Sequence, residues 1–191
     1  MKGEQLQKEQ VERKALFATL EGLSGFQKLS RKQQQMIQMS LYANDRFKRK
    51  DESPSTYLES VAHCYAWNCH SAAWYLEHEL PFESVPWRQD MDAYTEGTYL
   101  ESGNHPSYEA VAAHIESGGY PSIGIIHRDG RAIHSFVALG KDARGDVMVW
   151  EKEGYAFPYR LLPLRQVYNE HFEPNAVIPY SWGVRPFHIS S

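Results

Sequence analysis

Cysteine is scarce in this sequence, because the 191 residues include only Cys64 and Cys69. Two cysteines are too few for the disulfide framework of a small secreted domain, and a reducing compartment would keep both as thiols. No segment approaches the roughly 20 consecutive apolar residues of a transmembrane helix, and no early apolar run resembles a signal peptide. We therefore expect a protein that is cytoplasmic at synthesis and has no membrane partner, with secretion by a signal-less route left open.

A strong excess of charge is also missing, since the formal net charge is −4. Hydrophobic residues make up 42% and charged residues 23% of the chain, values typical of folded globular proteins. Residues 1–52 contain 11 Lys/Arg and 7 Asp/Glu, whereas residues 53–191 contain 9 and 17. The one basic cluster, RFKRK at 46–50, is short enough to be a solvated helix end. No nucleic-acid partner is predicted.

Two helices are predicted in the N-terminal part of the chain. Leucines recur at helical spacing over residues 4–23. Ser30 followed by Gln33 is a capping-box pattern, which predicts that a second helix starts there and continues to about Arg46.

The polar segment KDESPS, at 50–55, interrupts the helical pattern and indicates a domain boundary. We predict an N-terminal helical extension at 1–52 and a main domain at 53–191. The apolar faces of the extension need cover, so we expect it to pack over the main domain or to dock a protein partner.

The main domain is predicted to have an α+β fold. A third helix is expected from Asn68 or Cys69 to Leu80, with the thiol on its apolar face in the first turn. An acidic segment to about Pro106 is expected to be a loop or lid, and a short helix follows. From Pro121 the sequence alternates as strands do and predicts an antiparallel meander. Its expected strands are PSIGIIH, AIHSFVALG and VMVWEKEG, with an edge strand in YAFPYRLLPL and a last strand in VIPYSWGVRPF.

A thiol at the start of a helix is a candidate nucleophile. The unpaired N–H groups and the positive end of the helix dipole favour the thiolate form of Cys69 and can also bind an oxyanion. His134 opens the central strand of the meander and is the candidate base. The strand that follows brings Glu151 or Glu153 beside it as the group that orients the imidazole. Both glutamates share one face, and Glu151 is preferred because it belongs to the regular part of the strand.

The segments NCHSAAWYL, HSFVALG and VMVWEKEGY resemble the cysteine, histidine and acid/amide segments of the papain-like cysteine hydrolase superfamily, which includes NlpC/P60 peptidases, bacteriocin-processing peptidases and transglutaminase-like proteins. The resemblance covers about residues 68–154. It implies a papain-like core in which a nucleophile helix packs on an antiparallel sheet, and attack on an amide or thioester carbonyl. Cys69 then corresponds to the nucleophile, His134 to the base and Glu151 to the orienter. A histidine, His63, stands six positions upstream of the cysteine, where papain has an oxyanion-donating glutamine.

Two alternatives remain open at this point. The segment HCYAWNCH places His63, Cys64, Cys69 and His70 close together, and all four are competent zinc ligands, although the crowded spacing suits one tetrahedral site poorly. A non-catalytic protein-binding module is the other alternative. Our preferred interpretation is a cysteine-dependent hydrolase or acyltransferase of the peptidase or amidase type, with a peptide or other amide-containing substrate and with no metal or other cofactor.

Overall fold

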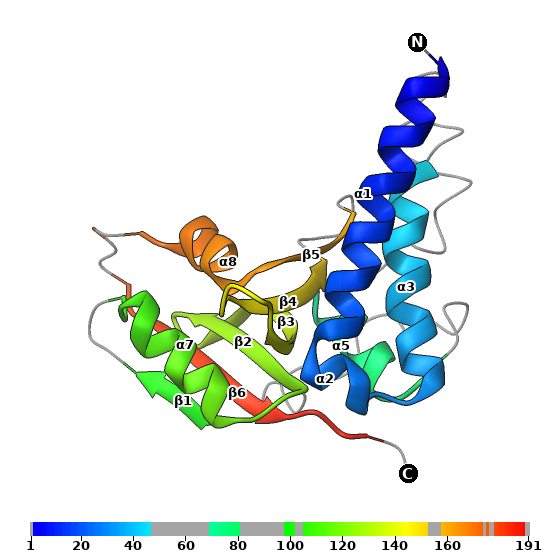
Figure 1. The fold of residues 1–191 in the computed structure, drawn as a ribbon. Helices are drawn as coiled ribbons and strands as arrows, with labels where there is room; N and C mark the ends of the chain where they lie inside the picture. Colours follow the sequence, from blue (N-terminus) through cyan, green and yellow to red (C-terminus); the bar gives the residue numbers. More distant parts are fainter. Residues whose placement is uncertain are drawn as a thin grey trace, which may run out of the picture.

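The computed structural model describes residues 2–46, 69–80, 98–101, 105–152, 158–173, 175 and 178–189. In these residues it contains six helices and one antiparallel sheet of six strands, which confirms the predicted α+β class. Helices α1, α2, α3 and α5 lie on one side of the sheet, and α7 and α8 lie on the other (Figure 1). No helix in the described part of the chain is long and apolar enough to cross a membrane.

The N-terminal helices are α1 (Lys2–Gly22), α2 (Ser24–Lys28) and α3 (Arg31–Arg46). The predicted capping box is present at the start of α3. The N–H of Gln33 donates to Ser30 Oγ at 3.1 Å, and the N–H of Ser30 donates to Gln33 Oε1 at 2.9 Å. The short helix α2 was not predicted. Its Gly25 lies against β3 so closely that a Cβ there would be 2.5 Å from the carbonyl oxygen of Leu139.

The middle of the chain supplies α5 (Cys69–Glu77), β1 (Thr98–Glu101) and α7 (Tyr108–Ser117). Helix α5 begins at Cys69 as predicted but ends before Leu80. Strand β1 falls within the segment predicted to be a loop or lid, and residues 81–97 of that segment lie outside the described residues.

The sheet consists of the strands β2 (Ser122–Arg128), β3 (Arg131–Lys141), β4 (Val147–Lys152), β5 (Tyr159–Pro163) and β6 (Tyr180–Pro186) together with β1. Their order is β1-β6-β2-β3-β4-β5, so the predicted meander is present and β5 is an edge strand, as expected. Asp129 and Gly130 both have positive φ, 52° and 68°, which is the hairpin turn typical of an Asp-Gly step. Helix α8 (Leu164–His171), between β5 and β6, was not predicted.

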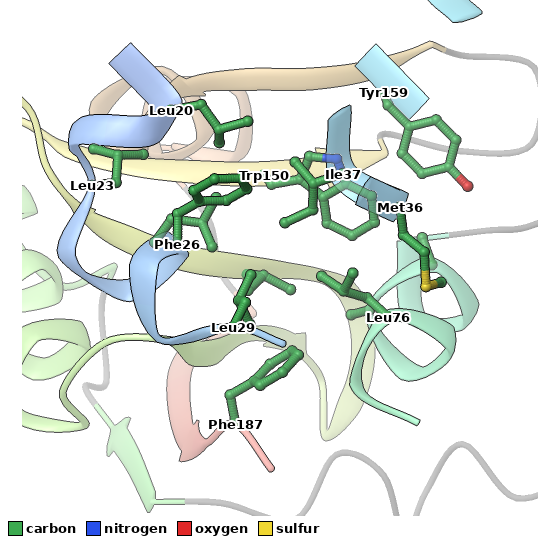
Figure 2. Packing of buried hydrophobic residues seen from close by; sticks show 14 of the residues in the cluster. Leu20, Leu23, Phe26, Leu29, Met36, Ile37, Leu76, Trp150, Tyr159 and Phe187 are labelled. Carbon is green, nitrogen blue, oxygen red and sulfur yellow. The ribbon is translucent and has the colours of Figure 1, made fainter. Parts of the chain in front are cut away.

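A single hydrophobic cluster joins the N-terminal helices to the sheet and to α5. Figure 2 shows the side chains of these helices around Trp150 of β4. The indole Nε1 donates to Ser40 Oγ of α3 at 3.0 Å, and the ring stacks on Tyr159 with centroids 5.2 Å apart. Burial of one large apolar side chain contributes roughly 1.5–3 kcal/mol. The N-terminal members of the cluster are Leu20, Leu23, Phe26, Leu29, Met36, Ile37 and Leu41.

The residues of α1, α2 and α3 that belong to this cluster are therefore covered by the main body of the protein, whereas Val11 and Met39 are 66% exposed. The proposed boundary between residues 1–52 and 53–191 lies outside the described residues, as does the KDESPS segment. The division into an extension and a catalytic domain stays a prediction. The shared cluster indicates that a chain starting at residue 53 would expose a large apolar surface of the sheet.

Candidate active site

Cys69 is the first residue of α5, and its side chain is buried, with 5% of the residue exposed. Ala72, Ala73 and Leu76 of the same helix belong to the hydrophobic cluster, which fixes the helix against β3 and β4. The N–H groups of the first helical turn have no partner within the helix. They place positive partial charge near the thiol.

His134 lies on β3 next to a β-bulge. Ile126 of β2 pairs with His134, but the next residue, His127, pairs with Ala132, so Ile133 is an extra residue in β3. Ile133 is 38% exposed, whereas His134 is 2% exposed. Bulges re-aim the side chains beside them, and this one turns the imidazole into the protein.

Glu151 lies on β4 and contacts His134 directly. Its Oε2 atom is 2.5 Å from His134 Nε2. The register pairs Glu151 with Phe136, so Glu151 is the diagonal neighbour of His134 rather than the residue opposite it. Alternation puts His134 and Phe136 on one face of β3, which explains the contact. Glu153, the other candidate orienter, lies outside the described residues.

Arg160 of β5 binds the carboxylate oxygen of Glu151 that does not contact His134. Its Nε donates to Glu151 Oε1 at 2.7 Å, and its Nη2 also donates to that oxygen. The same guanidinium donates to both carboxylate oxygens of Glu170 on α8, at 3.1 and 2.8 Å. Gln166 completes the group by donating to Glu170 Oε1 at 3.0 Å. Both oxygens of Glu151 are therefore hydrogen-bonded, and its direction is fixed.

The electrostatics of this group favour an ion pair. Burial alone would raise the pKa of Cys69, but hydrogen bonds to His134 and His70 and their charges outweigh it and lower the pKa to about 5. Burial would lower the pKa of His134, but its hydrogen bonds to Cys69 and Glu151 raise the pKa to about 9. Burial opposes ionisation of Glu151 as well, yet His134 and then Arg160 lower its pKa. Since Nε2 of His134 bonds Glu151, Nδ1 is the ring nitrogen left for the thiol.

A second histidine, His70, also lies beside the thiol. Its Nδ1 is 2.6 Å from the hydroxyl of Ser135 on β3, and its side chain helps to lower the pKa of Cys69. His70 is 8% exposed and Ser135 is fully buried. The sequence singled out His70 only as a candidate zinc ligand.

His171, the last residue of α8, stacks on His134 with ring centroids 5.0 Å apart. Burial, together with the charge of His134, lowers the pKa of His171 to about 4. The Nε2 atom of His105 lies 3.0 Å from the backbone oxygen of His171, and the His105 ring packs among aromatic rings. Helix α8 thus carries two groups of the site, Glu170 and His171, and neither could be found from sequence because α8 itself was not predicted.

The predicted candidates Cys69, His134 and Glu151 therefore form one connected group. A thiolate beside a protonated imidazole that is held by a carboxylate can attack an electron-poor carbon and pass a proton to a leaving group. In the described part of the chain, no group of three or more histidine, cysteine, aspartate or glutamate side chains is arranged to hold a metal ion. His63 and Cys64, the other half of the considered zinc cluster, lie outside the described residues.

No protein-family model, no curated protein and no solved structure matches the chain. The chemistry assigned to the site therefore rests on the side-chain arrangement alone.

Proposed function

We propose that this protein is a cysteine-dependent hydrolase or acyltransferase that acts on an amide-type bond and has a papain-like core. Cys69 would be the nucleophile, His134 the base and Glu151 the residue that orients and stabilises the imidazolium. The observation that carries the proposal is the buried contact of 2.5 Å between His134 Nε2 and Glu151 Oε2, on an imidazole that also lowers the pKa of the Cys69 thiol. A buried histidine with a purely structural role needs neither a carboxylate that is held by an arginine nor a thiol at the start of a helix.

The proposed reaction begins with the ion pair. The sulfur lone pair of Cys69 forms a C–S bond with the carbonyl carbon, and the π electrons of the carbonyl move to its oxygen. When these electrons re-form the C=O double bond, the C–N bond breaks and the leaving nitrogen takes the proton of the His134 imidazolium. The product of this half-reaction is a thioester on Cys69 and a neutral imidazole.

The second half-reaction regenerates the site. His134 takes a proton from water in hydrolysis, or from an amine in acyl transfer. At the same time the oxygen of the water, or the nitrogen of the amine, attacks the thioester carbonyl. Collapse of the intermediate breaks the C–S bond and releases an acid or a new amide, and the thiolate and the imidazolium are restored. Because an amide is the shared requirement, peptides, isopeptides and glutamine side chains are all substrates compatible with this chemistry.

The environment of each group supports its proposed part. A backbone N–H at the start of α5 can donate to the oxyanion, because the first N–H groups of a helix have no acceptor within the helix. Arg160 keeps Glu151 ionised, and an ionised Glu151 keeps His134 protonated. Between the pKa values of about 5 for Cys69 and about 9 for His134, the thiolate and imidazolium coexist.

The proposal is tested against the alternative of a non-catalytic binding module by alkylation of the full-length protein with iodoacetamide at neutral pH. The two cysteine peptides are then quantified separately by mass spectrometry. An activated Cys69 should react at least about tenfold faster than Cys64, since an ordinary thiol with a pKa near 8.5 is only a few per cent ionised. Equal and slow labelling of the two cysteines would favour the binding module.

A further inference from the structure

The site contains a polar pair that the proposed triad does not use. His70 follows Cys69 in α5, its Nδ1 lies 2.6 Å from the hydroxyl of Ser135, and its side chain is close enough to the thiol to lower the pKa of Cys69. With Nδ1 engaged by Ser135, the nitrogen left to face the sulfur is Nε2. Ser135 is fully buried on β3, beside His134, so the ring of His70 is held at a fixed place next to the reacting atom.

The two histidines have partners of different charge, a carboxylate for His134 and a hydroxyl for His70. This difference suits them to different roles. His134 bonds a carboxylate, which stabilises a protonated ring and suits it to exchange protons. His70 bonds a hydroxyl, which can either donate to a ring nitrogen or accept from it. When the Ser135 hydroxyl donates to Nδ1, the ring carries its proton on Nε2.

We propose that His70, oriented by Ser135, is a further catalytic residue whose Nε2–H donates to the oxyanion formed on the attacked carbonyl. This inference rests on the proposed function. Negative charge leaves the sulfur as the C–S bond forms and appears on an oxygen bound to the same carbon. A donor beside the sulfur is therefore next to the place where the new charge develops. The backbone N–H at the start of α5 and the Nε2–H of His70 together form the oxyanion site.

The test compares two reactions of the Cys69 thiolate, of which only one passes through an oxyanion. Alkylation by iodoacetamide displaces iodide and forms no oxyanion, whereas acylation by p-nitrophenyl acetate passes through one. Both rates are measured on the full-length chain in a Cys64→Ala background, at a pH on the alkylation plateau of each variant. The plateau removes any effect of a changed thiol pKa.

The variants are His70→Phe, which removes the donor, His70→Gln, which keeps one, and Ser135→Ala, which removes only the orienting hydroxyl. His78→Phe is the matched control, because His78 is exposed near the other end of the same helix and bonds only the backbone oxygen of Trp74 in the described structure. Circular dichroism and thermal unfolding establish that each variant is folded. If His70→Phe does not fold, the comparison of His70→Gln with Ser135→Ala carries the test.

We expect His70→Phe to slow acylation by about 100-fold, as loss of one oxyanion donor does elsewhere, while the alkylation rate stays within about threefold. His70→Gln should recover at least about tenfold of that loss, and should acylate faster than Ser135→Ala. Acylation within threefold of the control in His70→Phe would overturn the inference, and so would a parallel fall of both reactions. If instead wild-type Cys69 neither acylates nor alkylates faster than an ordinary thiol, the proposed function itself fails.

Discussion

Glu77 and Glu151 are both buried carboxylates held by an arginine, but their remaining partners differ. Arg185 of β6 donates to both oxygens of Glu77, at 2.9 and 2.5 Å, and the backbone N–H of His188 donates to one of them at 2.7 Å. Arg160 holds Glu151 in a similar way, but the other oxygen of Glu151 meets the imidazole of His134. A backbone N–H does not titrate, whereas an imidazole does.

The two carboxylates have different roles at the two ends of the same helix. Helix α5 ends at Glu77, which anchors it to β6, and begins at Cys69, whose thiol meets the histidine held by Glu151. Both glutamates have every charge matched by a hydrogen-bonded partner, as buried charges require. Only the arrangement at Cys69 leaves a proton that can move. We therefore interpret Glu77 as structural and Glu151 as part of the reacting group, and the following changes separate the two.

The largest effect on the reaction rate is expected from a change of Cys69, at the start of α5. Cys69→Ser replaces a thiolate by a hydroxyl that stays protonated near neutral pH, so acylation by p-nitrophenyl acetate should fall at least about 10⁴-fold. The thermal unfolding midpoint should change by only a few degrees, because the side chain keeps its size. Cys64→Ala is the matched control and should keep its activity. Loss of activity only in the Cys64 variant would transfer the nucleophile to the other cysteine.

At the structural end, Glu77→Ala should lower the free energy of unfolding by about 3–5 kcal/mol, because Arg185 is left without its buried partner. Urea unfolding followed by tryptophan fluorescence measures the change. Glu116→Ala is the control, since Glu116 pairs with Lys141 at 2.9 Å on the surface and such pairs contribute about 0–1 kcal/mol. Equal losses for the two variants would show that the Glu77 contact does not anchor α5.

A smaller effect on the barrier is expected from Glu151→Gln, which keeps a hydrogen bond but removes the charge. Acylation should slow at least about tenfold, equivalent to about 1.4 kcal/mol. The alkaline limb of the rate should also move below its pH of about 9, because His134 loses the negative charge that raises its pKa. Glu153→Gln should have little effect. A larger loss in Glu153→Gln than in Glu151→Gln would assign the orienting role to Glu153.

Local signals predicted most of the elements. The capping box of Ser30 and Gln33 and the turn of Asp129 and Gly130 depend on a few neighbouring residues, and both appear as expected. The start of α5 at Cys69 was also predicted. Helices α2 and α8 were missed for different reasons. The first is only 5 residues long, and the second begins at Leu164, the last residue of the predicted edge-strand segment, and continues through residues 165–171, for which no element was predicted.

The contacts around the site could be predicted only in part. Alternation placed Glu151 on the correct face, but the bulges in β3 and the pairing of Glu151 with Phe136 depend on the whole sheet. The ion pairs of Arg160 with Glu151 and Glu170 join three elements whose relative placement the sequence does not reveal. The contact of His70 with Ser135 likewise depends on how α5 packs on β3.

The pH dependence of alkylation at Cys69 shows whether His134 holds this residue as a thiolate. The rate of iodoacetamide attachment to the Cys69 peptide follows the thiolate fraction, which rises with pH through the pKa of the thiol. We expect a half-maximal rate near pH 5 and a midpoint well above that in His134→Ala, because the imidazolium is what favours the thiolate. A wild-type midpoint near 8.5, the value of an ordinary thiol, would contradict the ion pair and the chemistry proposed from it.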